Sequence, residues 1–107
     1  MGLKRWEIGE IASRIGQLYY NYYLRTSDAK FLTESFIFYE AILHREYFKE
    51  HDKDVALANK QLRYNARFIV ICLLLNRRET VDILVRQLRV LVDEYGRTFQ
   101  EVGRMFV

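Results

Sequence analysis

The chain has 107 residues, of which 50% are hydrophobic and 29% are charged, with five Gly, one Cys and no Pro. This length suits one domain, the apolar content excludes a disordered chain, and the scarcity of Gly and Pro excludes collagen-like and linker-like sequences. The net charge of +3 is too small to indicate a nucleic-acid partner by itself. We therefore predict a single folded domain over residues 1–107.

No segment has the pattern of a membrane span or a secretion signal. The longest unbroken apolar run covers residues 68–75, well short of the roughly 18 residues that a spanning helix needs. Glu7 and Glu10 interrupt the stretch where a signal peptide would carry its apolar region. A single cysteine cannot form an internal disulfide. We expect a protein of the cytoplasm or nucleus that makes no use of a membrane.

The spacing of apolar residues predicts a first helix over residues 3–25. No proline interrupts the chain, and apolar residues recur at steps of three and four, the period of one helix face. The expected inner face consists of Ile8, Ile11, Ile15, Leu18, Tyr19 and Tyr22. Residues 26–28 then suit a turn, with Ser27 or Asp28 as the N-cap of the next helix.

Two further helices are expected from about residue 29 and from about residue 55, separated by the polar stretch 49–54. Asp52 or Asp54 is the candidate N-cap of the third helix. The second helix is apolar over more than half its circumference, so it must be covered from two sides. The third should pack centrally, because the apolar run 68–75 surrounds its axis. Its expected core stripe is Ala58, Leu62, Ala66, Ile69, Val70 and Leu73.

A break over residues 76–80 precedes a fourth helix, whose apolar residues keep the three-and-four spacing from residue 81 to residue 102. Asn76 is suited to the left-handed conformation that often follows a helix. Gly96 lies within the pattern, and the sequence leaves open whether the helix ends there or continues.

Four helices with short connections predict an all-α fold of two antiparallel helical hairpins. These can form a four-helix bundle or stack as a tetratricopeptide-like solenoid segment. Gly16 and Ser35 would let the first two helices approach closely, with Tyr19 and Tyr39 filling the groove beside them. The tetratricopeptide match is partial, since Ala12 stands where the pattern has Trp, so both architectures stay open. The predicted core includes Ile11, Ile15, Tyr19, Phe36, Tyr39, Ile69, Leu73, Leu84, Leu88 and Leu91.

Signatures of catalysis are sparse, and we predict neither an enzyme nor a bound metal or cofactor. Cys72 lies inside an apolar run, where a buried thiol is inert because burial raises its pKa. His44 and His51 have no cysteine nearby to complete a zinc site. Carboxylate pairs such as Glu7 with Glu10 have basic neighbours, as on a solvated helix face.

Two groups of residues are candidates for partner binding. Four tyrosines within one helical turn cannot all face one neighbour, so Tyr20 and Tyr23 should reach a second layer or solvent, where Tyr suits protein interfaces. Ile83, Val90 and Phe106 should form an apolar patch on the outer side of the fourth helix and the C-terminal tail. Such a patch would serve self-association or the docking of the remainder of a longer chain.

An alternative function is nucleic-acid binding by basic residues on the third and fourth helices. The candidates recur at steps of three and four and are Lys60, Arg63, Arg67, Arg86 and Arg89. Acidic residues such as Asp82 and Asp93 are interleaved and no recognised nucleic-acid motif accompanies the basic residues, so solvated faces or inter-helix ion pairs are the favoured explanation.

Several long strings rich in Trp and Tyr resemble the N-terminal region of the suppressor of cancer cell invasion (SCAI) family. They are LKRWEIGEIAS at 3–13, IGQLYY at 15–20, YYLRTS at 22–27, QLRY at 61–64 and ARFIV at 66–70. The resemblance implies a non-enzymatic protein-interaction module of a longer nuclear transcription cofactor. The family represses signalling through serum-response-factor coactivators and takes part in DNA-break repair. It also implies a nuclear location, with no catalytic residue to carry over.

Overall fold

The computed structural model describes residues 2–48 and 55–105. Four helices follow one another along the chain: α1 (Arg5–Thr26), α2 (Ala29–Arg45), α3 (Val55–Leu74) and α4 (Arg78–Met105). The described part holds no strand. The all-α prediction is therefore confirmed. Gly96 lies inside α4, which settles the question that the sequence left open.

The turns between helices use the residues that the sequence indicated. Asp28 caps α2, because its Oδ1 accepts a hydrogen bond of 3.0 Å from the Lys30 backbone N–H. Ser27 and Asn76 both adopt left-handed backbone conformations, with φ of 58° and 59°. The cap expected at Asp52 or Asp54 lies outside the described residues, as does His51.

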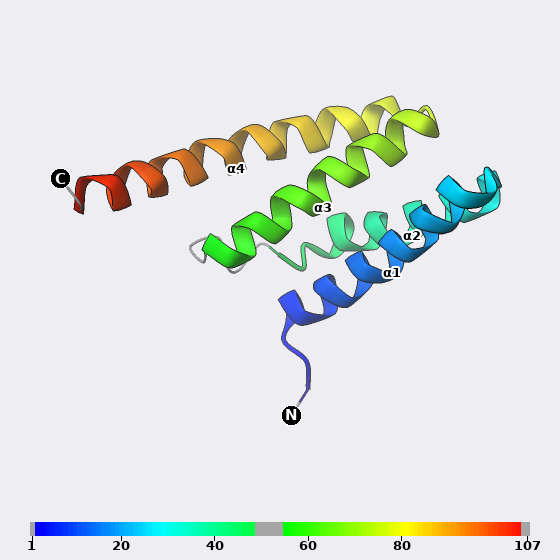
Figure 1. Ribbon diagram of the computed structural model, residues 1–107, viewed down its shortest axis with the longest axis horizontal. Coiled ribbons are helices and arrows are strands. Elements are labelled where there is room, and N and C mark those ends of the chain that lie inside the picture. The colour runs from blue at the N-terminus through cyan, green and yellow to red at the C-terminus, as the bar shows by residue number, and fades with distance from the viewer. Residues whose placement is uncertain (1, 49–54, 106–107) are drawn as a thin grey trace.

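The helices form two antiparallel hairpins that stack side by side (Figure 1). In the described residues α3 packs on both α2 and α1, whereas α4 packs along α3 and contacts the first hairpin only weakly. A closed bundle would bring α4 back against α1, so the arrangement is a stack. The radius of gyration of 15.2 Å exceeds the roughly 13 Å of a compact domain of this length.

The core lies where α2 meets α3 and is built largely of aromatic rings. Tyr39 is fully buried and lies 5.6 Å from Phe68 and 5.7 Å from Tyr64, measured between ring centroids. Phe36 meets the edge of Phe68 at 5.7 Å, and Leu84 of α4 is also fully buried. The core prediction was right for Phe36, Tyr39 and Leu84. Five further predicted residues are half-buried, namely Ile15, Tyr19, Ile69, Leu88 and Leu91.

The predicted inner face of α3 is wrong. Leu73 is 61% exposed and Val70 is 42% exposed, whereas Phe68, Ile71 and Cys72 are fully buried. The apolar run surrounds the helix axis, so periodicity could not tell the side that meets α2 from the opposite side. The Tyr39 ring of α2 contacts both Phe68 and Tyr64 and so selects these residues for the inner side, because aromatic rings pack edge-on or offset against one another.

The predicted inner face of α1 is also wrong. Ile11 is 46% exposed, and the helix buries Gly9 and Gly16 instead. A Cβ added at Gly9 would lie 2.8 Å from the Cβ of Tyr47. Small residues on the inner face of α1 let α2 and the residues just after it approach closely. The aromatic rings of that segment fill the space between the two helices. Ile11, Leu18 and Tyr22 consequently lie on the outer side of α1.

The close approach expected from Gly16 and Ser35 is confirmed. The Ser35 hydroxyl donates a buried hydrogen bond of 2.7 Å to the Gly16 carbonyl, which joins α2 to α1. The Tyr39 ring lies only 3.0 Å from the position a Cβ on Gly16 would take. Tyr19 fills the neighbouring groove by stacking on Phe38, with centroids 5.8 Å apart. The tetratricopeptide-like contact is thus present in the first hairpin.

Candidate functional site

The outer side of α1 carries a row of large apolar residues, which we call the α1 stripe. Ile15 is half-buried, and the other members are between 37% and 59% exposed. The members are Ile8, Ile11, Ile15, Leu18 and Tyr22. Their spacing of three and four residues alternates along two heptads, which is the pattern of a helix that packs against another helix. The described chain leaves this row largely uncovered.

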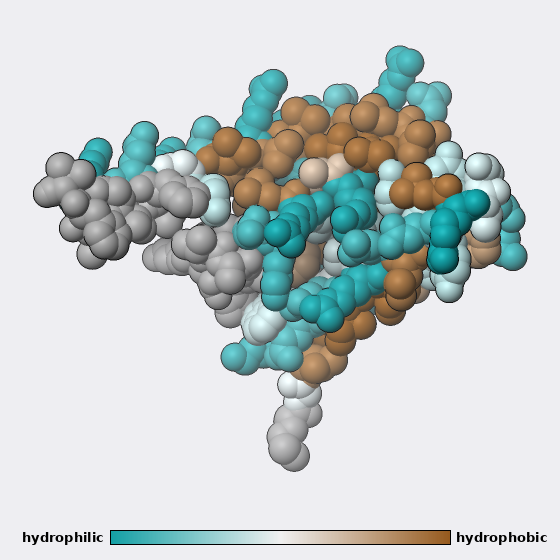
Figure 2. Space-filling view, viewed as in Figure 1, coloured by the Kyte–Doolittle hydropathy of each residue, from teal (hydrophilic) through white to brown (hydrophobic). Residues whose placement is uncertain are grey.

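The second hairpin has an apolar face of its own on the side away from α2. On α3 it includes Val70, Leu73 and Leu74, and on α4 it includes Val92, which is 53% exposed. Figure 2 shows apolar side chains gathered over α3 and α4. Scattered exposed apolar residues are ordinary, but Val70, Leu73 and Leu74 lie within one turn on the same side of α3.

Tyr20 and Tyr23 lie half-buried against the core, with ring centroids 6.3 Å apart. Tyr22, assigned to the inner face from the sequence, is the more exposed tyrosine at 46%. Its ring packs on Phe31 at 5.5 Å, and the Arg25 guanidinium lies 4.9 Å from its centroid. The role of Tyr20 and Tyr23 in partner binding stays a prediction, and their location makes Tyr22 a more accessible contact.

Ile83 and Val90 are 45% and 56% exposed and share one face of α4, since residues seven apart nearly superimpose around a helix. Val90 also lines a pocket that faces the first hairpin. The two residues therefore lie on a different side of α4 from Val92. Phe106, the third member of the predicted patch, lies outside the described residues.

The basic residues do not form one surface in the described chain. Lys60 turns to α1, where its ammonium lies 3.0 Å from Glu10 Oε1 and 5.9 Å from the Trp6 ring centroid. That hydrogen bond lowers the pKa of Glu10. Arg86 instead lines the pocket between the hairpins. The remaining three are Arg63 and Arg89, which are exposed, and Arg67, which is half-buried.

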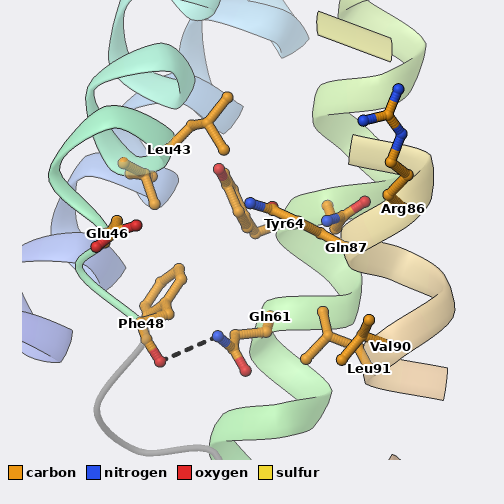
Figure 3. Close-up of a pocket in the computed structure, with 11 residues that line it drawn as sticks. Leu43, Glu46, Phe48, Gln61, Tyr64, Arg86, Gln87, Val90 and Leu91 are labelled. Carbon is orange, nitrogen blue, oxygen red and sulfur yellow. Dashed lines mark hydrogen bonds between the residues drawn. The ribbon is translucent and has the colours of Figure 1, made fainter. Parts of the chain in front are cut away.

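A pocket of about 460 Å³ lies between the C-terminal part of α2, the middle of α3 and the middle of α4 (Figure 3). Its apolar wall comes from Ile42, Leu43, Phe48, Val90 and Leu91. Its polar wall comes from Glu46, Gln61, Tyr64, Asn65, Arg86 and Gln87. The volume is in the range of about 300–1,000 Å³ that is usual for ligand sites.

Among the described residues, three polar atoms of the pocket lining are buried without a hydrogen-bond partner: Gln61 Oε1, Tyr64 Oη and Asn65 Oδ1. Asn65 is 1% exposed and Tyr64 is 6% exposed. Burial raises the pKa of Tyr64, so its hydroxyl stays protonated at neutral pH. Buried polar groups are nearly always hydrogen-bonded, and an unpartnered one needs an explanation.

The titratable groups that the sequence singled out take structural roles. Cys72 is fully buried, and burial raises its pKa to about 11, as expected for an inert thiol. Glu7 accepts a hydrogen bond of 3.2 Å from the Lys4 backbone at the start of α1. His44 lies 3.8 Å from Glu40 one turn away. In the described part no three such groups cluster to hold a metal, and no helix is long and apolar enough to cross a membrane.

Sequence reasoning missed the pocket and the outward direction of the α1 stripe. Gln61 and Asn65 are polar residues, so the pattern of apolar residues on this helix gives no signal for their burial. The available signal for α1 was the placement of Gly9 and Gly16 seven residues apart, which marks a face of close approach. Ile8 and Ile15 each directly precede one of these glycines, so their side chains lie about 100° around the helix axis from the glycine face.

Comparison with known proteins places the chain in one group. The family model described as Protein SCAI matches residues 1–104. The chain is 58% identical over 101 residues to the Protein SCAI homolog of Dictyostelium discoideum, and 54% identical over 100 residues to Protein SCAI of mouse and human. Each match covers 92% of this chain but only 13–16% of the relative. No solved structure matches.

Proposed function

The chain belongs to the SCAI family, and from that premise we propose that it acts as a non-catalytic protein-interaction module. It spans 13–16% of the length of the curated relatives that it matches. The module would therefore supply one interaction surface of a longer protein of this family.

The α1 stripe is the observation that carries this proposal. Ile11, Leu18 and Tyr22 are 46%, 59% and 46% exposed on one helix face. Covering one such side chain with a partner stabilises a complex by up to about 1.5–3 kcal/mol, before the entropic cost of association. The spacing suits an apolar helix laid along α1.

The apolar face of the second hairpin supports a second docking surface. In the first hairpin, α1 and α2 together form the surface on which α3 packs. In the second hairpin, exposed apolar residues of α3 and α4 offer a comparable surface. A further helix, or a second copy of the chain, would cover Leu73 and Val92 in the way that α3 covers the first hairpin. We include self-association in the proposal on this ground.

The family membership also supports a more specific proposal. The module would serve a nuclear transcription cofactor that represses serum-response-factor coactivators and takes part in DNA-break repair. A nuclear location belongs to the same proposal. The nucleic-acid alternative has less support, because Lys60 is engaged with α1 and Arg86 faces the pocket.

Quantitative capture from nuclear extract tests the proposed function. The full chain is compared with a double variant, Ile11→Gln with Leu18→Gln, in which two exposed stripe residues become polar. We expect at least a tenfold loss of captured protein, because the stripe loses two apolar contacts. Circular dichroism should be unchanged, since neither side chain is buried.

Ile37→Gln is the matched control, because Ile37 is 50% exposed on α2 and lies outside the α1 stripe. Capture should be unchanged in this variant. Equal loss in both variants, or full capture by the double variant, would contradict the proposal. Binding that survives the double variant but falls steeply with salt would favour the nucleic-acid alternative.

A further inference from the structure

The α1 stripe continues onto α2 through a cluster of aromatic rings. Tyr22 packs on Phe31 with ring centroids 5.5 Å apart, and Tyr19 stacks on Phe31 at 6.4 Å and on Phe38 at 5.8 Å. Phe31 and Phe38 are seven residues apart, so they share one face of α2. The stripe and these rings therefore form one largely apolar surface across both helices. Two neighbouring helices of this kind accommodate a third helix, as α1 and α2 do for α3.

Two cations stand at the end of this surface, next to the turn between α1 and α2. Arg25 follows Tyr22 by three residues and so continues the stripe, with its guanidinium carbon 4.9 Å from the Tyr22 ring centroid. The Lys30 ammonium lies 5.6 Å from the Phe31 ring centroid. Both basic residues are exposed. Because the Tyr22 and Phe31 rings contact each other, the two cations flank one aromatic pair.

Neither cation has an ion-pair partner among the described residues. Asp28 lies between them in sequence, but its carboxylate accepts from the Lys30 backbone N–H and offsets the partial positive charge at the start of α2. Glu34 is half-buried one turn after Lys30 and makes no ion pair with it. It repels an acidic group placed along the middle of α2. The carboxylates of an occupant therefore belong at the end that carries Arg25.

We propose that this surface binds an amphipathic helix of a protein partner, with its apolar side along the α1 stripe and its carboxylates against Arg25 and Lys30. The three-and-four spacing of the stripe suits a helix as the occupant. Each cation is already held against a ring, so less side-chain freedom is lost when a carboxylate binds. The assignment rests on the proposed function and names the charge of the segment that the α1 stripe recognises.

Fluorescence anisotropy with three labelled synthetic helical peptides tests the charge requirement. The peptides share one leucine stripe over about 20 residues, and two positions beside the stripe near one end carry Glu, Gln or Lys. We expect the Glu peptide to bind the full chain about three- to tenfold more tightly than the Gln peptide, and the Lys peptide to bind most weakly. Equal affinities, or tightest binding of the Lys peptide, would overturn the proposal.

A double variant, Arg25→Gln with Lys30→Gln, tests the location. Both residues are exposed, so circular dichroism should be unchanged, and the advantage of the Glu peptide should fall below about twofold. Arg63→Gln with Arg89→Gln is the matched control, because it removes two exposed cations from the second hairpin. The advantage should persist in this control. Its survival in the first variant, or an equal loss in both, would contradict the assignment to Arg25 and Lys30.

The same peptides separate this proposal from the proposed function when they are applied to the double variant Ile11→Gln with Leu18→Gln. Weaker binding of all three peptides to that variant, together with equal affinities for the unaltered chain, would retain the α1 stripe as an interface and reject the acidic partner. Unchanged binding of all three peptides would reject the α1 stripe as the docking surface and the acidic partner with it.

Discussion

Gly16 shows how a single hydrogen atom in place of a side chain permits the first hairpin to form. The Tyr39 ring lies 3.0 Å from the position of a Cβ at this residue, and Ser35 bonds to the Gly16 carbonyl. Tyr39 has little room to yield, because it is fully buried and stacks on Phe68. The sequence indicated this contact because a glycine and a serine occur at matching positions on two helices.

Replacing Gly16 by Ala should therefore destabilise the protein, although alanine favours helix by about 1 kcal/mol over glycine. Overpacking against Tyr39 costs about 1–3 kcal/mol, so we expect a net loss of up to about 2 kcal/mol in chemical denaturation. Gly96→Ala is the control, since no atom of the described residues lies within 4 Å of its added Cβ. It should stabilise the chain by about 0.5–1 kcal/mol. Stabilisation by both substitutions would contradict the close packing.

At the scale of elements, the residues at which helices begin and end follow from local chemistry. The side of each helix that faces the core does not. Asp28 and Asn76 marked an N-cap and a left-handed turn because their short polar side chains act within a few residues. The inner faces of α1 and α3 depend on residues far away in sequence. Small residues on α1 and rings on α2 decide them, so Ile11 and Leu73 lie outside although periodicity assigned them to the core.

The orientation of α3 makes two truncations differ sharply. Phe68→Ala should cost about 3–5 kcal/mol, because the ring is fully buried between Tyr39, Tyr64 and Phe36. Leu73→Ala should cost less than about 1 kcal/mol, because the side chain is 61% exposed. Urea denaturation of both variants measures the difference. A loss at Leu73 as large as that at Phe68 would show that α3 is rotated relative to this account.

At the scale of the whole molecule, stacking in place of closure leaves apolar surface uncovered. The α1 stripe lies on one outer side and the face with Leu73 and Val92 lies on another. The pocket opens between the hairpins because α4 contacts α2 only weakly. The locations of these surfaces could not be predicted from the sequence, because each depends on which helices do not pack against one another in the fold. Together they make the interaction module the central claim.

Site-specific photo-crosslinking tests that claim most directly. A benzophenone-bearing phenylalanine derivative replaces Leu18 on the α1 stripe in one sample and Ile37 on α2 in another; the two residues are 59% and 50% exposed. Both samples are irradiated in nuclear extract, and covalent adducts are identified by mass. We expect a discrete protein adduct at the Leu18 position and none at the Ile37 position. The same adducts from both positions, or none from either, would contradict the assignment of the α1 stripe as an interface.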